Sequence, residues 1–349
     1  MQNPSPLTPE NRPLSPHLFE RPRPGDNRLA SLIDEAGRMR AFLPPFRFTS
    51  FFSPEDTLLC VLASEAALAH ARKIPEATDA QEPIGIVELT TGSGLVGLHL
   101  LRLESKGSLV GLDVDALAID TATRNATTLG LAERARFECA DLWDAGTNEI
   151  LAAYHADLII CNPPYVPEPS HEVLAVEAGS GADGTAHLER TLELVKQLTP
   201  RAMALSWCSL SDPARIVRDA ARAGYVLNSL FVAAIADGEY SGSVHSYLRD
   251  LDTAYINESS ETKAAIASDG SARFSYLLMA GDFSRGAANP ATADAVERMC
   301  ESFASTGLAV LENPEAPIPV RTWLLDRWDE VRLRAFLHGP RETTAATVA

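Results

Sequence analysis

The feature of this sequence that most restricts its fold is the alternation of short apolar segments and helix-like segments between Phe46 and Arg285. Strands that are apolar throughout are typical of a parallel sheet covered by helices on both faces. The sequence therefore predicts an α/β fold with a doubly wound, mostly parallel seven-stranded sheet. We expect its strands at Ile84–Leu89, Leu109–Leu112, Ala135–Glu138, Leu158–Cys161, Met203–Cys208, Leu230–Ala234 and Phe274–Ala280. Helices are expected at Leu95–Glu104, Ala116–Leu129, Ala186–Leu198 and Pro213–Ala223.

Two further regions flank the predicted sheet. Residues 1–45 begin as a Pro-rich arm and continue with helical spacing at 27–42, so an arm and one short helix are expected. Residues 286–349 show mostly helical spacing and are expected to form a C-terminal extension. The predicted main domain is therefore 46–285, in which the polar stretch Ser241–Gly270 has the composition of an insertion.

Charge and cysteine usage restrict the partners and the compartment. The formal net charge is −17, and no long run of Lys or Arg offsets it, which disfavours nucleic acid as a partner and favours a protein or a small molecule. The five cysteines show no CxxC pair and no metal-ligand spacing, and the four in apolar stretches are expected to be buried: Cys60, Cys139, Cys161 and Cys208. Without a signal peptide or a long apolar run, we predict a cytoplasmic protein with no membrane association and no metal.

A glycine-rich turn follows the first predicted strand, in the segment VELTTGSGLVGLHL. Gly92, Gly94 and Gly97 allow a sharp turn and a close approach of the backbone to a ligand, and the following helix offers free amides. The same residues match the GxGxxG pattern of dinucleotide enzymes, so a dinucleotide-dependent oxidoreductase is one alternative. A tight strand–helix corner without a ligand is another.

Acidic residues end the second and third predicted strands. Asp113 is placed where a carboxylate can accept hydrogen bonds from both hydroxyls of a ribose. Asp115 is better placed to cap the next helix. Asp141 follows the third strand, where an adenine edge would lie in a nucleoside site, and an Asp that begins a turn is the alternative.

The segment Asn162-Pro163-Pro164-Tyr165 follows the fourth predicted strand, and its residue types suit the binding of a planar N–H group. The nitrogen of an amide or an aromatic amine is a poor nucleophile, because its lone pair is delocalised. The side-chain oxygen of Asn162 and the carbonyl of Pro163 can accept hydrogen bonds from such a nitrogen, while Tyr165 stacks on its planar group. The prolines hold the carbonyl in place. A turn that merely ends the strand is the alternative.

The ordered segments VELTTGSG, LDVD, ADL and DLIICNPPY resemble class I methyltransferases of the HemK/PrmC type, over roughly Phe52–Ala234. SPEDTLL before the glycine turn and GSGADG after Tyr165 resemble further segments of that family. The resemblance implies a Rossmann-like fold, S-adenosyl-L-methionine as cofactor and methylation of a planar nitrogen, foremost a glutamine side chain of a translation release factor. Adenine and guanine methyltransferases share Asn-Pro-Pro-Tyr, so a nucleic-acid base is the alternative acceptor.

The resemblance also assigns roles in the cofactor site. It implies that Thr57, Gly92, Gly94 and Asn162 belong to that site, and that Glu88 holds the methionine end of the cofactor, unless Glu88 instead orders nearby loop amides. Helix capping is the alternative for Asp56 and Thr57. Thr90 stands where the family pattern has its first glycine, and we expect it to line the same pocket.

Overall fold

The computed structural model describes residues 54–72, 83–170, 174–267, 270–287 and 289–324. The predicted arm at 1–45 and the predicted helix at 27–42 lie outside these residues, as does the end of the predicted C-terminal extension.

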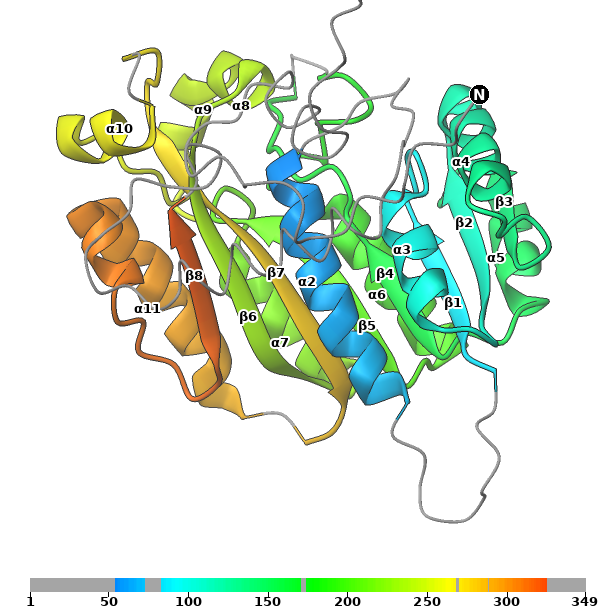
Figure 1. Cartoon of the computed structure of the whole chain (residues 1–349). Coiled ribbons are helices and arrows are strands. Elements are labelled where there is room, and N and C mark those ends of the chain that lie inside the picture. Colours follow the sequence, from blue (N-terminus) through cyan, green and yellow to red (C-terminus); the bar gives the residue numbers. More distant parts are fainter. Residues whose placement is uncertain (1–53, 73–82, 171–173, 268–269, 288, 325–349) are drawn as a thin grey trace, which may run out of the picture.

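A single eight-stranded sheet forms the centre of the molecule, with the order β3-β2-β1-β4-β5-β7-β6-β8 (Figure 1). Its strands are β1 (Gly85–Leu89), β2 (Ser108–Asp113), β3 (Ala135–Cys139), β4 (Leu158–Cys161), β5 (Ala202–Cys208), β6 (Tyr225–Ala236), β7 (Ser275–Arg285) and β8 (Val320–Leu324). Only β7 runs antiparallel to its neighbours β5 and β6. The strand order reverses between β1 and β4, and ligands of open α/β sheets bind beside the carboxyl ends of strands at such a point.

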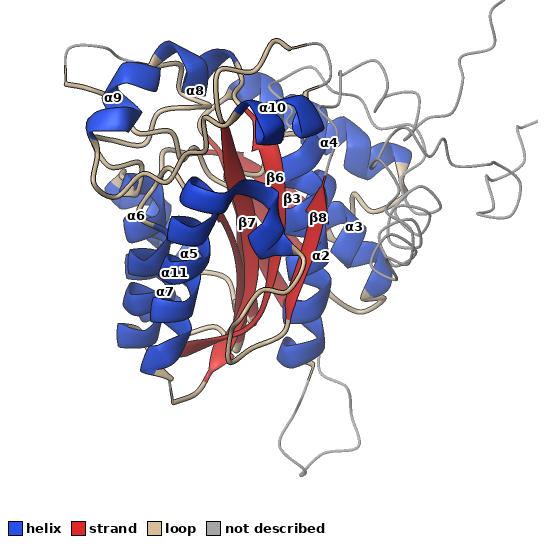
Figure 2. Ribbon diagram, turned by 90° about the vertical axis from the view of Figure 1, so that its left-hand side faces the viewer, coloured by secondary structure: helices blue, strands red, loops and turns tan. Residues whose placement is uncertain are grey.

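Helices cover both faces of the sheet, as the view in Figure 2 shows. One face carries α2 (Pro54–Ala71), α3 (Leu95–Leu103) and α4 (Ala116–Thr128). The other face carries α5 (Ala145–Ala152), α6 (Ala186–Leu198), α7 (Pro213–Arg222) and α11 (Pro290–Thr306). Three short helices lie near the carboxyl end of β6: α8 (Glu239–Ser243), α9 (His245–Asp250) and α10 (Ser260–Ile266).

Two apolar cores follow from these layers. One lies between the sheet and α2–α3, where Leu58, Leu59 and Leu98 are almost completely buried. The other lies between the sheet and α6, α7 and α11, and contains Trp207 and Phe283. Because each strand of the sheet's centre contributes to both cores, its sequence is apolar throughout, which is the pattern that predicted a covered sheet.

Local signals at the helix starts explain several boundaries. Asp115 accepts a hydrogen bond from the amide of Leu117 at 2.8 Å, so the predicted cap of α4 is confirmed. The side chain of Asp212 caps α7, which begins at Pro213, and Asn289 followed by Pro290 does the same for α11. Proline suits the first helical position because the amide it lacks would have no partner there.

The sheet is larger than the sequence indicated. Seven strands were expected, whereas β8 adds an eighth, parallel to β6. The chain reaches β8 through α11, whose buried Val296 and Phe303 belong to the second core. Residues 290–324 therefore extend the same sheet and core beyond the predicted boundary at residue 286.

The predicted strands and helices are observed with shifts at their ends. The largest shifts affect β6 and β7, which begin or end several residues beyond their apolar centres. Sequence reasoning gave no helix for α5 or for the stretch that contains α8–α10. Cys139 was expected to be buried but is exposed, because β3 is the edge strand of the sheet.

Candidate active site

The turn between β1 and α3 adopts the sharp geometry that its glycines suggested. Gly92 has φ 53° and Gly94 has φ 74°, both in the left-handed region that favours glycine. The amide of Gly92 donates to Oδ2 of Asp113 at 2.8 Å, which joins the turn to the end of β2. The N-cap residue Gly94 has no side chain to cap α3, and the amide of Gly97 is bound by Glu88, so the amides of Leu95 and Val96 are those that could bind a ligand.

Gly94 contributes to the turn by allowing close packing of its backbone against neighbouring elements. A Cβ atom at this position would lie 3.0 Å from Cβ of Ala122 and 3.1 Å from the ring of Phe137. Its role in the structure is therefore close packing against α4 and β3. Gly94 does not line the cavity described below, and its predicted contact with a cofactor stays a prediction.

Thr90 adopts a conformation that is unfavourable for a β-branched residue. Its φ is 56°, and its hydroxyl donates to the carbonyl of Leu89 at 2.5 Å. A Cβ in the left-handed region crowds the backbone, which explains why the resembling family has glycine here. The Thr90 side chain lines the cavity, as expected.

The carboxylate of Asp113 is tied to the backbone on both sides of the turn. Besides the amide of Gly92, it accepts a hydrogen bond from the amide of Asp115 at 2.9 Å. Burial raises the pKa of Asp113 although these amides lower it. A carboxylate fixed in this way is oriented before any ligand arrives.

Asp141 and Trp143 lie at the end of β3. Oδ1 of Asp141 accepts a hydrogen bond from the amide of Trp143 at 2.9 Å, which is the turn that the alternative reading of Asp141 described. Asp141 also lines the cavity, together with the Trp143 side chain, which is 53% exposed. The contact with an adenine thus stays a prediction for Asp141.

Glu88 is 3% exposed, and its carboxylate reaches toward α3. It accepts a hydrogen bond from the hydroxyl of Thr91 at 2.5 Å and another from the backbone of Gly97. Burial raises its pKa from 4.5 to about 7. These contacts match the alternative in which Glu88 orders loop amides, while its place on the cavity wall leaves a cofactor contact as a prediction.

Asn162 stands directly after β4 with an unsatisfied acceptor. Its Oδ1 is buried and accepts no hydrogen bond from any residue that the structure describes. A buried polar atom without a partner costs free energy, and such atoms are found where a ligand completes the contact. Pro163 is buried beside it, and its carbonyl likewise accepts no backbone hydrogen bond within the described ranges.

Tyr165 is held in place by a residue that lies far from it in the sequence. Its hydroxyl donates to Oδ2 of Asp56, in the first turn of α2, at 2.5 Å. Burial, reinforced by the Asp56 carboxylate, raises the pKa of Tyr165 well above its usual range. Tyr165 therefore stays neutral, and its ring is held at a fixed position next to Asn162.

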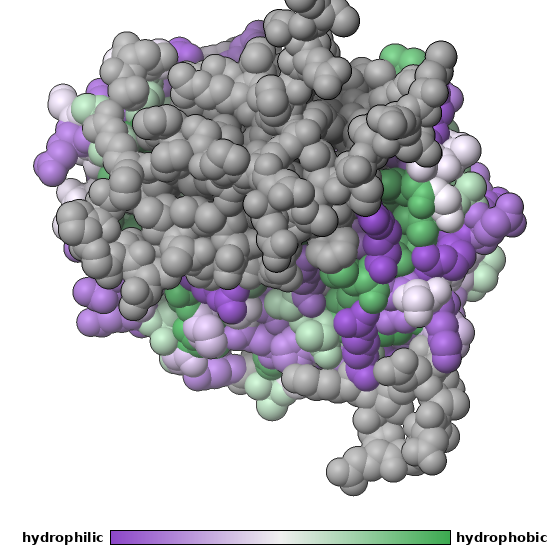
Figure 3. Space-filling view, in the orientation of Figure 1, coloured by the Kyte–Doolittle hydropathy of each residue, from purple (hydrophilic) through white to green (hydrophobic). Residues whose placement is uncertain are grey.

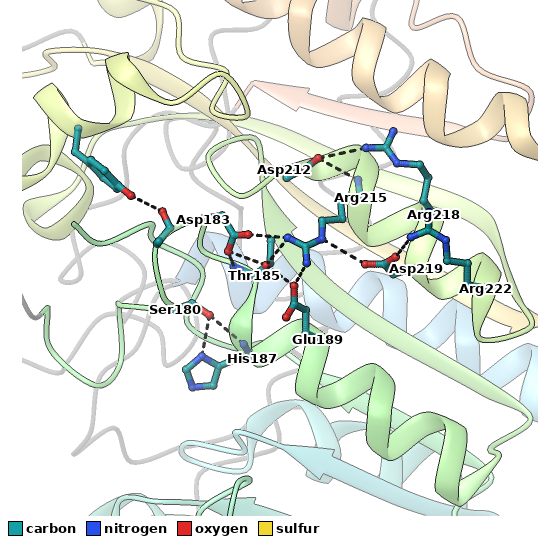
Figure 4. Close-up of polar contacts among 12 residues, drawn as sticks. Ser180, Asp183, Thr185, His187, Glu189, Asp212, Arg215, Arg218, Asp219 and Arg222 are labelled. Atoms are coloured by element: carbon teal, nitrogen blue, oxygen red, sulfur yellow. Dashed lines mark hydrogen bonds and ion pairs between the residues drawn. The ribbon is translucent and has the colours of Figure 1, made fainter. Parts of the chain in front are cut away.

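The loop after Tyr165 packs closely against this segment because it contains glycine at a critical point. A Cβ atom at Gly184 would lie 2.4 Å from the carbonyl oxygen of Tyr165. Figure 4 shows how the loop is fixed: Arg215 of α7 binds Asp183 at 2.7 Å and also contacts Glu189 and Asp219. The oxygen of Ser180 accepts a hydrogen bond from the amide of His187 at 3.1 Å, at the start of α6.

These residues surround one cavity of about 680 Å³ at the carboxyl ends of the strands. This volume falls in the range of small-molecule sites. Ten residues were predicted from the sequence as cofactor-binding or catalytic, and all but Gly94 line the cavity: Thr57, Glu88, Thr90, Gly92, Asp113, Asp141, Asn162, Pro163 and Tyr165. Asp56 also lines it.

Sequence reasoning missed one wall of the cavity. It consists of Val176–Ala178 from the loop after Tyr165 and of residues 235, 236 and 238–241 from the end of β6 and α8. The hydroxyl of Tyr240 donates to Oε1 of Glu177 at 2.6 Å and joins the two segments. The carboxyl end of the sixth predicted strand was the available signal, because β6 is parallel to β4 and ends at the same edge.

The part of the chain described by the structure was also searched for a metal site and for a membrane-spanning helix. No group of three or more His, Cys, Asp or Glu residues there is arranged to hold a metal ion. No described helix is long and apolar enough to cross a bilayer.

The strand order, the glycine turn and the cavity define the class I methyltransferase fold. Consistent with this, residues 68–190 match the protein family described as Methyltransferase small domain. The match confirms, for residues 68–190, the predicted resemblance to the methyltransferases that use S-adenosylmethionine.

Named relatives agree with this family. The chain is 33% identical to a release factor glutamine methyltransferase of Chlorobaculum tepidum over 129 residues, 36% of this chain and 44% of the relative. It is 33% identical to a ribosomal protein uL3 glutamine methyltransferase of Neisseria meningitidis over 128 residues, 34% of this chain and 40% of the relative. The matches thus span less than half of these relatives.

Among solved structures, the chain is similar to a putative RNA methyltransferase of Pyrococcus horikoshii with a TM-score of 0.43 and 13% identity. That match covers 73% of this chain and 98% of the other.

Proposed function

We propose that this protein is an S-adenosylmethionine-dependent N-methyltransferase whose acceptor is a planar nitrogen, namely the side-chain amide of a protein glutamine. The observation that carries the proposal is the buried, unpartnered Oδ1 of Asn162 on the wall of the cavity. An acceptor in this state favours a substrate that donates a hydrogen bond, as the N–H groups of an amide do, over one that would leave it unsatisfied.

The cavity fits the cofactor through residues on its first three strands. The amides of Leu95 and Val96 at the start of α3, the oriented carboxylate of Asp113 and the aromatic side chain of Trp143 suit a carboxylate, a ribose and an adenine in turn. When bound, S-adenosylmethionine supplies an electrophilic methyl group.

The chain's own residues then orient the acceptor nitrogen. Oδ1 of Asn162 and the carbonyl of Pro163 accept hydrogen bonds from its two N–H bonds and stabilise the positive charge that develops on nitrogen. Tyr165, fixed by Asp56, packs on the planar amide. The reaction then requires no covalent bond between protein and substrate.

Two observations favour glutamine over a nucleic-acid base. The curated relatives at 33% identity are named for glutamine methylation of a release factor or of ribosomal protein uL3. A relative at 26% identity over 89 residues is named for adenine methylation of tRNA. The cavity wall has no described Lys or Arg that could contact a phosphate backbone. A translation release factor is accordingly the partner that we propose first, in the cytoplasm.

The test is methyl transfer from labelled S-adenosylmethionine into a cell extract, followed by mass identification of the labelled species. We expect label in a protein glutamine and none with Asn162→Ala. Label in RNA would replace the acceptor by a base. Binding of NADH in place of S-adenosylhomocysteine would overturn the proposal as a whole.

A further inference from the structure

Asp56 lines the cavity, although it is not among the residues predicted to bind the cofactor or the acceptor. It lies in the first turn of α2, and a negative charge is favourable at the N-terminus of a helix. Its side chain is 7% exposed, and its Oδ2 accepts the hydrogen bond from the hydroxyl of Tyr165 at 2.5 Å. This bond joins two segments of the cavity that are 109 residues apart in the sequence.

The helix that carries Asp56 is a fixed support. α2 packs across β5 and β7 on one face of the sheet (Figure 1). Its next residues are almost completely buried in the first apolar core: Leu58, Leu59, Cys60, Val61 and Leu62. Close packing opposes any movement of this turn, because movement would open a void in the core. The Asp56 carboxylate therefore has a defined position relative to the sheet.

The backbone on both sides of Tyr165 is restricted as well. Two prolines precede it, and their rings fix φ. The amide of Val166, directly after it, donates to the carbonyl of Ala178 at 2.9 Å. The freedom that remains is rotation of the Tyr165 side chain between its rotamers, and the hydrogen bond to Asp56 holds the far end of the ring.

The same hydrogen bond determines where the hydroxyl proton of Tyr165 goes. A tyrosine hydroxyl has one proton to donate, and here Asp56 accepts it. Burial, reinforced by the Asp56 carboxylate, raises the pKa of Tyr165, so the hydroxyl keeps this proton. Tyr165 therefore has no proton to give to Oδ1 of Asn162, which accepts no hydrogen bond from a described residue. Asp56 thus orients the ring and also leaves the Asn162 oxygen to a ligand.

We propose that Asp56 is a positioning residue for methyl transfer, which acts through the Tyr165 hydroxyl to hold the Tyr165 ring beside Asn162. The inference rests on the proposed function, since it assumes that the acceptor nitrogen binds at Asn162. It adds α2 to the parts of the chain that determine the rate, because this helix controls how the segment Asn162–Tyr165 receives the acceptor.

The experiment is a double-mutant cycle on the full chain. Its readout is the initial rate of label transfer from saturating S-adenosylmethionine into a cell extract. Asp56→Ala releases the ring and should lower this rate by roughly 10- to 100-fold, because small misplacements near a reacting group are costly. Tyr165→Phe keeps the ring but loses the hydroxyl, so it should cause a similar loss. The double variant should be no slower than the slower single variant, because both changes remove the same hydrogen bond.

Asp56→Asn separates the hydrogen bond from the charge. Its amide oxygen can still accept from the Tyr165 hydroxyl, so this variant should recover most of the rate that Asp56→Ala loses. In every variant the Kd for S-adenosylhomocysteine should stay close to that of the unchanged protein. Losses that multiply in the double variant would overturn the proposal. So would an Asp56→Asn protein as slow as Asp56→Ala, or a loss of cofactor affinity as large as the loss of rate.

Two variants outside the cavity are matched controls. Asp212→Ala removes a carboxylate from the start of another helix, α7. Tyr225→Phe removes a hydroxyl that donates to the carbonyl of Pro200 at 2.7 Å. Neither residue lines the cavity, so both variants should be less stable without slower transfer. If they slow transfer as much as the Asp56 and Tyr165 variants do, lost stability explains the effect and the proposal is refuted.

A second readout does not depend on turnover. In the full chain labelled with ¹³C at Cζ of tyrosine, the Tyr165 resonance is the one that Tyr165→Phe removes. Asp56→Ala should shift this resonance, because Cζ carries the hydroxyl that loses its acceptor, and an unchanged resonance would contradict the proposal.

The labelled species separates this inference from the proposed function. If the label is in an RNA base while the rates obey the cycle and the resonance shifts, the role of Asp56 stands and the proposed acceptor is wrong. If the label is in a protein glutamine while the losses multiply, the proposed reaction stands and the role of Asp56 is refuted.

Discussion

The two sides of the cavity are organised by different kinds of contact. On the cofactor side, polar side chains bind backbone amides a few residues away or across one strand, as Asp113 does with Gly92 and Asp115. On the acceptor side, side chains bind other side chains far along the chain, as Tyr165 does with Asp56 and Tyr240 with Glu177. Asn162 between them keeps one acceptor unsatisfied.

This difference indicates two degrees of preparation for a ligand. Backbone amides that hold Asp113 and Glu88 fix the cofactor side before binding, so that little ordering cost remains. The acceptor side has a defined wall, but its central acceptor, Asn162, is completed only by a substrate. Changes on one side should therefore affect cofactor affinity, and changes on the other should affect the rate of transfer.

Replacing Asn162 by Ala should give the largest effect. Removing one positioned acceptor is expected to lower the rate constant of methyl transfer by roughly 100- to 1,000-fold, by analogy with the loss of one oxyanion-hole group. Because the unsatisfied Oδ1 of Asn162 is proposed to bind the acceptor nitrogen, the Kd for S-adenosylhomocysteine should change far less than the rate. Label incorporation and calorimetry measure the two quantities. An equal loss of cofactor affinity would assign Asn162 to the cofactor side.

Glu88→Gln should remove part of the pH dependence of stability. Burial raises the pKa of Glu88 in the folded chain to about 7, so the folded state binds more protons than the unfolded state between pH 4.5 and 7. Its contribution therefore destabilises the fold as pH rises through this window, by up to about 3 kcal/mol above pH 7. Urea unfolding at pH 5 and pH 8 should show a smaller loss in the variant. An identical loss would mean that Glu88 titrates normally.

Asp113→Ala should weaken cofactor binding and leave the rate at saturation nearly unchanged. Loss of a charge-assisted hydrogen bond costs about 1.5–3 kcal/mol, which corresponds to a roughly 10- to 100-fold higher Kd. Asp115→Ala is the matched control, because Asp115 caps α4. That control should lower the free energy of unfolding by about 1 kcal/mol while the Kd stays constant. Equal Kd changes in both variants would contradict the assignment of Asp113.

Thr90→Gly should give the smallest effect, and in the stabilising direction. Glycine relieves the crowding at φ 56°, so the free energy of unfolding should rise by about 1 kcal/mol. Thermal unfolding measures this gain. Thr91→Gly is the control, since Thr91 has an ordinary φ and donates a hydrogen bond to Glu88, so that this variant should be less stable. A stabilised Thr90→Gly protein with lower cofactor affinity would show that the Thr90 side chain contacts the ligand.

Much of the cofactor side was predictable because its signals are local. A buried strand, a glycine turn and an acid at the next strand end follow one another along the chain, and the structure brings Gly92 and Asp113 together as expected. The cavity wall that sequence reasoning missed depends on β6, whose direction is set by the antiparallel strand β7 inserted beside it. No short sequence window contains that information.

Other differences have the same origin. The eighth strand lies in a segment with helical neighbours, and only its pairing with β6 identifies it. The position of Asp56 under Tyr165 depends on the packing of α2 across the sheet, which the motif before the glycine turn did not reveal. Thr90 was recognised as a departure from the family pattern, but its left-handed backbone became evident only in three dimensions.

The pairing of β8 with β6 also affects how this chain behaves if it is shortened. A chain cut after residue 286 would lose α11 and β8, and the twelve-residue strand β6 would become the border of the sheet. Its unpaired amides and carbonyls would then be available to strands of other molecules, which is a common route to aggregation. For recombinant expression, a fragment that ends at the predicted domain boundary is therefore a poor choice, and one that retains residue 324 keeps this border protected.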